Sequence, residues 1–125
     1  MKYLGIDFGL RRVGLAISEG SLASPWKVIE VRSLQETVEK IEEIVLGGNF
    51  DKVVVGLPEG KMGDRVRGFI NLLKKKKLDV ESTDETLSTH KASLQMIELN
   101  IPVKKRRIND DMAAAIILQN WLDQR

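Results

Sequence analysis

Six acidic residues stand where carboxylates from distant parts of the chain could meet. Each follows an apolar run of strand type or opens one of helix type, and the ends of parallel strands converge on one edge of an open sheet. Converging carboxylates repel one another unless divalent cations join them, and Mg²⁺ or Mn²⁺ held in this way promotes displacement at a phosphodiester. The pattern therefore predicts metal-dependent phosphodiester hydrolysis. The six positions are Asp7, Glu59, Asp84, Glu85, Asp110 and Asp111.

Asp7 carries the strongest signal, because it ends the first apolar run of YLGIDFGLRRVGLAIS, residues 3–18. This stretch is typical of a buried strand, a tight turn and a second, paired strand that begins at Val13. An ionised Asp in such a run costs several kcal/mol unless a metal, a bound phosphate or hydrogen bonds compensate. The alternative is an Asp that only caps the turn.

The other acidic positions keep open alternatives. Glu59, in LPEG, fits a turn residue as well as a metal ligand. Strand alternation puts Asp84 and Glu85 on opposite faces, so only one of them faces inward. Asp110 and Asp111 both align with apolar positions of the last helix, and one would cap that helix while the other binds metal. The spacing does not decide which.

The basic residues are clustered, although the formal net charge is only +2. Arg11 and Arg12 stand beside the turn after Asp7, where they could contact anions. A second cluster precedes Asp110 and could neutralise phosphates. The run Lys74–Lys77 is better explained as the solvated C-terminal end of a helix. The second cluster consists of Lys104, Lys105, Arg106 and Arg107.

Hydrophobic periodicity predicts an α/β fold with a mixed sheet of five strands flanked by helices. The first three strands would form an antiparallel meander, and two parallel strands would follow through helical crossovers. The predicted third strand is Trp26–Arg32, and the first helix spans residues 34–46 between an N-cap at Ser33 and a stop at Gly47 and Gly48. The later elements are a strand at 53–57, a helix at 64–76, a strand at 78–83, a helix at 88–98 and a last helix from 110, capped by Asn109 or Asp110.

Length and composition set further limits. A chain of 125 residues with 42% hydrophobic content predicts one domain, residues 1–125, with room for a core. There is no Cys, so thiolate metal sites and thiol nucleophiles are excluded. We expect a cytoplasmic protein that is not inserted in a membrane, because no apolar run approaches the roughly 18 residues of a spanning helix. Nothing in the sequence indicates an oligomeric state.

Four stretches, in this order and spacing, resemble the YqgF (RuvX-like) family nearly from end to end: GIDFGLRRVGLAIS, VVVGLP, DETLST and DDMAAAIILQNWL. The resemblance implies a ribonuclease H-like fold related to Holliday junction resolvases. It also implies a nuclease that matures the 5′ end of pre-16S ribosomal RNA. Older descriptions of the family give Holliday junction resolution instead, which stays as the alternative. The implied substrate is thus structured RNA or a DNA junction.

Carried over residue by residue, the resemblance implies that Asp7, Glu85 and Asp110 form the catalytic set and hold Mg²⁺ or Mn²⁺. Arg11, Arg12 and the cluster at 104–107 would hold the backbone phosphates.

Several positions depart from the family pattern. Thr86 stands where the family usually has Arg, which removes an expected phosphate contact, and Ser88 replaces a Thr. The stretch EGKMGDR is shorter than the family's loop after GLP. These departures leave room for an altered substrate choice or a lost activity. His90, the only His, is left out of the predicted site because a lone His near a helix start is more often structural or solvated.

Two rival functions come from other classes. A non-catalytic nucleic-acid-binding module would keep the fold without bringing Asp7, Glu85 and Asp110 within metal-ligand reach. An actin-like ATPase is suggested by DFGLRRVG, which resembles a first phosphate loop, but that fold needs two lobes and 125 residues supply one. A junction resolvase, within the nuclease class, would be expected to act as a symmetric dimer.

Overall fold

β1 and β4 lie side by side within a five-stranded sheet of order β3-β2-β1-β4-β5. The computed structural model describes residues 1–84 and 109–125. β1 pairs antiparallel with β2, and β2 with β3, whereas β1–β4 and β4–β5 are parallel. This confirms the predicted meander followed by two parallel strands. The elements are β1 (Tyr3–Asp7), β2 (Arg12–Ser18), β3 (Ala23–Glu30), α1 (Leu34–Gly48), β4 (Lys52–Leu57), α2 (Gly60–Lys75), β5 (Val80–Asp84) and α4 (Asp110–Asp123).

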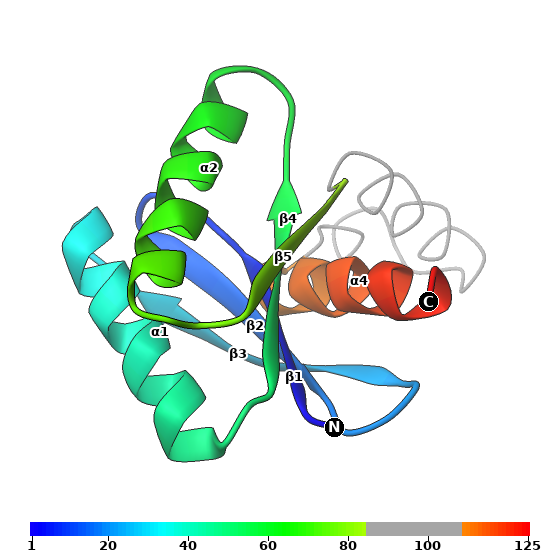
Figure 1. The fold of residues 1–125 in the computed structure, drawn as a ribbon. Coiled ribbons are helices and arrows are strands. Elements are labelled where there is room, and N and C mark those ends of the chain that lie inside the picture. Colours follow the sequence, from blue (N-terminus) through cyan, green and yellow to red (C-terminus); the bar gives the residue numbers. More distant parts are fainter. Residues whose placement is uncertain (85–108) are drawn as a thin grey trace.

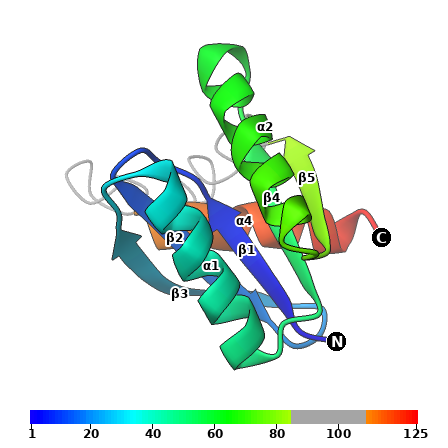
Figure 2. The ribbon, with the colours of Figure 1, turned by 60° about the vertical axis from the view of Figure 1, so that its left-hand side comes forward.

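Helices cover both faces of the sheet. In Figure 1, α1 and α2 lie on one side of the strands and α4 on the other. Figure 2 gives the same layers from another direction, with α1 in front of β1 and α4 behind it. None of the helices in residues 1–84 and 109–125 has the length and apolar character needed to cross a bilayer.

Strand alternation divides β1 between two hydrophobic cores. Leu4 and Ile6 belong to the core under α1 and α2 and are fully buried. Tyr3 belongs to the second core, with Ala114 and Trp121 of α4. Every second residue of β1, counted from Tyr3, therefore faces α4.

The boundaries differ from the prediction where tertiary contacts override the local pattern. β3 begins at Ala23 rather than Trp26, because pairing with β2 starts at Ser18. The ladder is irregular between Leu15 and Ala16, where Trp26 is the extra residue on β3. Such a bulge breaks the alternation on which the prediction rested.

The end of the first helix and the start of the second helix also differ from the prediction. α1 continues through Gly48 and ends at Asn49, which takes the left-handed conformation (φ 56°) that closes a helix. α2 begins at Gly60, four residues before the predicted start at Asp64. Gly63 in this extra turn packs against the Pro58 carbonyl, so the contact is made by a residue with no apolar side chain to reveal it. The helix predicted at 88–98 lies outside the described residues.

Candidate functional site

Asp7 lies at the carboxyl end of β1, the edge at which parallel strand ends converge. It is half-buried, between fully buried Ile6 and buried Phe8. Alternation places its side chain on the face of Tyr3 and Gly5, which is the face covered by α4. Asp7 is thus the last residue of the strand, directly before the turn, with its side chain on the α4 side of the sheet.

α4 runs along this face of β1, in the direction opposite to the strand. Tyr3, at the start of β1, packs edge-on against Trp121 near the end of α4, with ring centroids 5.1 Å apart. Gly5 lies under the middle of α4, where an added Cβ would be 2.7 Å from Leu118 Cβ. The next residue on this face is Asp7, and the helix start is the next part of α4. Strand and helix thus bring Asp7 towards the first turn of α4.

Gly14 allows the backbone at the start of α4 to approach β2 closely. It is the Cα partner of Asp7 in the β1–β2 ladder, and directly opposite residues of an antiparallel pair project to the same face. A Cβ added to Gly14 would lie 1.9 Å from the Asp110 carbonyl oxygen, so the backbone of α4 rests directly on this glycine. Asp7 and Asp110 therefore extend from neighbouring backbone positions. Gly14 is not among the predicted site residues; its signal in the sequence is a glycine inside an otherwise apolar strand, which often marks close backbone approach.

Asp110 is held from the other side by Arg12. The Arg12 Nε lies 3.3 Å from Asp110 Oδ2, and the two side chains are 60% and 31% exposed. Arg12 was predicted as a phosphate contact, and the structure gives its guanidinium a carboxylate partner as well. Because both groups are partly solvated, this ion pair contributes positioning more than stability.

Asp111 differs from Asp110 in its partner. Its Oδ1 accepts a hydrogen bond from the Met112 backbone N–H at 2.9 Å, a local contact within the first turn. Asn109 is the N-cap but makes no side-chain capping bond. Of the two carboxylates that the spacing left undecided, Asp111 satisfies the helix start and Asp110 is tied to the β2 side of the site.

Asp84 and Glu59 differ from Asp7 and Asp110 in where they lie on the fold. Val80 is buried under α1 and α2, so alternation places Asp84 on that face of β5 and not on the face of Asp7. Glu59 is the exposed N-cap of α2 and makes no side-chain capping bond. Glu85 follows Asp84 directly in the chain but lies outside the described residues. The same is true of Thr86, Ser88, His90 and the basic cluster Lys104, Lys105, Arg106 and Arg107.

The donor chemistry of Asp7 and Asp110 fits a hard divalent cation. Carboxylate oxygens are the ligands that Mg²⁺ and Mn²⁺ prefer, and Mg²⁺ is commonly bound through one or two carboxylates and several waters. Arg12 already lies against Asp110 Oδ2, so a bound cation would share this carboxylate with the guanidinium. Residues 1–84 and 109–125 contain no group of three His, Cys, Asp or Glu side chains arranged for a metal ion. The described part of the site therefore offers a pair of carboxylates.

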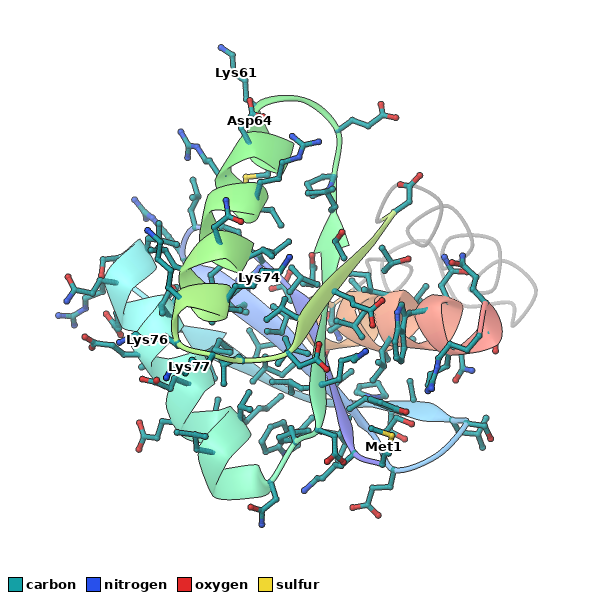
Figure 3. All side chains as sticks on the ribbon, in the orientation of Figure 1. Met1, Lys61, Asp64, Lys74, Lys76 and Lys77 are labelled. Carbon is teal, nitrogen blue, oxygen red and sulfur yellow. The ribbon has the colours of Figure 1, made fainter. Side chains whose placement is uncertain are left out.

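The lysine run at the end of α2 lies away from this site. Figure 3 shows Lys76 and Lys77 at the end of α2 opposite to Lys61. Lys77 lines a depression with Asp51 and Lys52, which belong to the amino end of β4, whereas Asp7 is at a carboxyl end. The position agrees with a solvated helix end.

Comparison with known proteins is decisive on the family. The model of the family described as "RuvX: Holliday junction resolvase" matches residues 1–124. The chain belongs to the RuvX family. A relative from Endomicrobium trichonymphae is 38% identical over 98% of this chain and 95% of its own length, and one from Bacillus cereus is 37% identical over the full length of both. Both are named "Putative pre-16S rRNA nuclease".

Solved structures agree on the fold of this RuvX-family chain. Thermus thermophilus RuvC in complex with a Holliday junction substrate superposes with a TM-score of 0.65, at 13% identity, over 100% of this chain and 95% of the other. A fowlpox virus resolvase with junction DNA gives 0.60, at 11% identity, over 99% and 98%. The predicted ribonuclease H-like fold is confirmed.

Proposed function

We propose that this RuvX-family chain is a divalent-metal-dependent nuclease that hydrolyses phosphodiesters of structured RNA, with the 5′ end of pre-16S rRNA as its substrate. The observation that carries the proposal is the meeting of Asp7 and the first turn of α4 over Gly14. It supplies two carboxylates, from opposite ends of the described chain, at one point of the sheet edge. The names of the full-length relatives support RNA as the substrate.

Asp7, Asp110 and Glu85 are the proposed metal-binding and catalytic residues. When Mg²⁺ or Mn²⁺ is bound, it supplies a nucleophile at neutral pH and neutralises the charge that develops on the phosphate. Asp7 would be a rigid ligand, because its strand pairs on both sides. Asp110 would be oriented by Arg12, whose exposed side remains available to a substrate phosphate. Glu85 enters from the family resemblance.

Cleavage assays test the proposal directly. Labelled structured RNA carrying a pre-16S 5′ region and a four-way DNA junction are incubated with Mg²⁺, with Mn²⁺ and with chelator. The chain should cut the RNA only with metal, and Asp7→Asn should lose cutting, because it keeps the shape and removes the charge. Asp123→Asn is the matched control, since it makes the same change at the other end of α4.

The outcomes separate the candidate functions. Preferential cutting of the junction would overturn RNA maturation in favour of the resolvase, the function by which the family is described. Binding of both nucleic acids without any cutting would overturn the nuclease and favour a binding module. Cutting that survives in Asp7→Asn would show that Asp7 is not part of the site.

A further inference from the structure

An open groove with a volume of about 920 Å³ lies beside the acidic pair, between the start of α1 and the outer strands β2 and β3. Ile29 and Val31 contribute apolar surface to it. The other lining residues are charged: Arg11, Arg12, Arg32, Lys40, Glu30 and Glu36. Four cationic side chains against two acidic ones give the groove a net positive charge.

The acidic charge of Glu36 is already compensated within the groove. Its Oε1 lies 3.1 Å from Lys40 Nζ, and its Oε2 accepts a hydrogen bond from the Arg32 backbone N–H at 3.2 Å. The hydrogen bond from Lys40 is the main cause of a lowered pKa at Glu36, which keeps this carboxyl ionised and paired. Lys40 is further held by a hydrogen bond to the Glu30 carbonyl at 3.0 Å. Lys40 and Glu36 therefore form a neutral internal pair.

Arg11 and Arg32 supply two further positive charges, against the one remaining carboxylate of Glu30. Within residues 1–84 and 109–125, neither guanidinium makes an ion pair or a side-chain hydrogen bond. Both are exposed. Their backbones are nevertheless fixed, since the Val31 N–H donates to the Arg11 carbonyl at 2.8 Å and Ser33 caps α1 directly after Arg32. Two exposed guanidinium groups on a rigid base are suited to bidentate contacts with phosphate.

Arg12 joins this groove to the acidic pair. It lines the groove and lies 3.3 Å from Asp110 Oδ2, so the groove ends at the proposed catalytic residues. The N-terminus of α1 is at the same edge and adds the positive end of its helix dipole. A polyanion bound at Asp110 can thus extend along the groove and remain in contact with cationic groups.

We propose that this groove binds the sugar-phosphate backbone of the nucleic-acid substrate next to the scissile bond, with Arg11 and Arg32 as its phosphate contacts. The inference rests on the proposed nuclease function and adds a direction: the substrate leaves the site over β3 and the start of α1, not over the lysine run of α2. A nucleic-acid backbone is favoured over an acidic peptide because its phosphates repeat regularly and match a row of guanidinium groups that leads to a phosphodiester-cleaving site.

Binding is measured in the Asp7→Asn background, so that cleavage does not interfere. The Kd for labelled structured RNA is determined at several salt concentrations, in the presence of Mg²⁺. Arg32→Gln should lower the slope of log Kd against log salt by about 1, and the double variant Arg11→Gln, Arg32→Gln should lower it by about 2. Each phosphate contact releases about one counterion from the RNA, so a variant that lacks a contact releases one fewer on binding. Arg32→Lys should keep most of the slope.

Lys75→Gln is the matched control, because it removes one exposed charge at the far end of α2 and should leave the slope unchanged. An unchanged slope in the double variant, with circular dichroism confirming the fold, would overturn the groove. Displacement of the RNA by polyglutamate at equal charge concentration would overturn the nucleic-acid assignment. If Asp7→Asn still cuts while the slope falls as expected, the proposed catalytic residues fail and the groove stands.

Discussion

Gly14→Ala is the most direct test of how the site is assembled. The added Cβ would lie 1.9 Å from the Asp110 carbonyl oxygen and 2.2 Å from its carbonyl carbon. Real Cβ contacts stay above 3.0 Å, so the start of α4 must move by about 1 Å or more. Both contacts are backbone atoms, which cannot turn aside as a flexible side chain would. Overpacking of this kind typically costs about 1–3 kcal/mol of stability.

The displacement also carries Asp110 away from Asp7. A misplacement of about 1 Å at a reacting centre can cost about 100-fold in rate. We therefore expect Gly14→Ala to fold, to unfold at lower urea concentration, and to lose about two orders of magnitude in metal-dependent cleavage. Equilibrium unfolding and single-turnover cleavage measure the two effects separately.

Gly68→Ala is the matched control for this change. Gly68 lies inside α2 with nothing within 4 Å of an added Cβ, so Ala should stabilise the protein by about 0.5–1 kcal/mol and leave cleavage unchanged. If Gly14→Ala proved as stable and as active as the parent chain, α4 would not begin over Gly14, and the assembly of Asp7 with Asp110 would be refuted.

Two further predictions concern stability. Ser33→Ala removes the cap in which Ser33 Oγ accepts from the Glu36 N–H at 3.1 Å, and should cost about 1 kcal/mol in urea unfolding; no change would mean that the cap is dispensable. Glu81 has its pKa lowered below 4.5, chiefly by a hydrogen bond from Lys52 at 2.5 Å. A lowered carboxyl pKa contributes stability above pH 4.5 that is lost as pH falls through the folded-state value. Lys52→Gln should therefore make the melting temperature less dependent on pH on the acid side of 4.5, and an unaltered acid limb would contradict the pairing.

The sequence predicted the sheet because its signal is local. Alternation, apolar runs and turn residues decide which stretches are strands, and the order of strands and helices then restricts the topology to a few possibilities. The same alternation placed Asp7 at the end of β1. The sequence does not predict which face of the sheet carries the Asp7 side chain. The contact of Tyr3 with Trp121 identifies this face as the one covered by α4.

The choice between Asp110 and Asp111 could not be made from spacing. Both precede residues buried against the sheet, and helical periodicity treats them alike. The difference lies in the partners: Asp111 binds the adjacent Met112 N–H, whereas Asp110 meets Arg12 from β2. Long-range contacts of this kind depend on the position at which α4 packs on the sheet. Glycines that carry no periodic signal determine this position.

The groove beside the site likewise could not be predicted from the sequence alone. Arg11 is a predicted anion contact because it stands beside the turn after Asp7, whereas Arg32 is predicted only as the last residue of a strand and not as a site residue. The hydrogen bond from Val31 to the Arg11 carbonyl is what brings the two arginines to one groove.

The packing of α4 over β1 has a consequence for the timing of activity in the cell. α4 follows all five strands in the chain, and among the described residues it is α4 that covers the face of Tyr3, Ala16 and Val54, so this core can close only after α4 has been synthesised. Until then Asp7 has no Asp110 beside it. Under the proposed function, a chain whose α4 has not docked lacks one of the two carboxylates of the described site and should not cut RNA, so cleavage would require the complete fold.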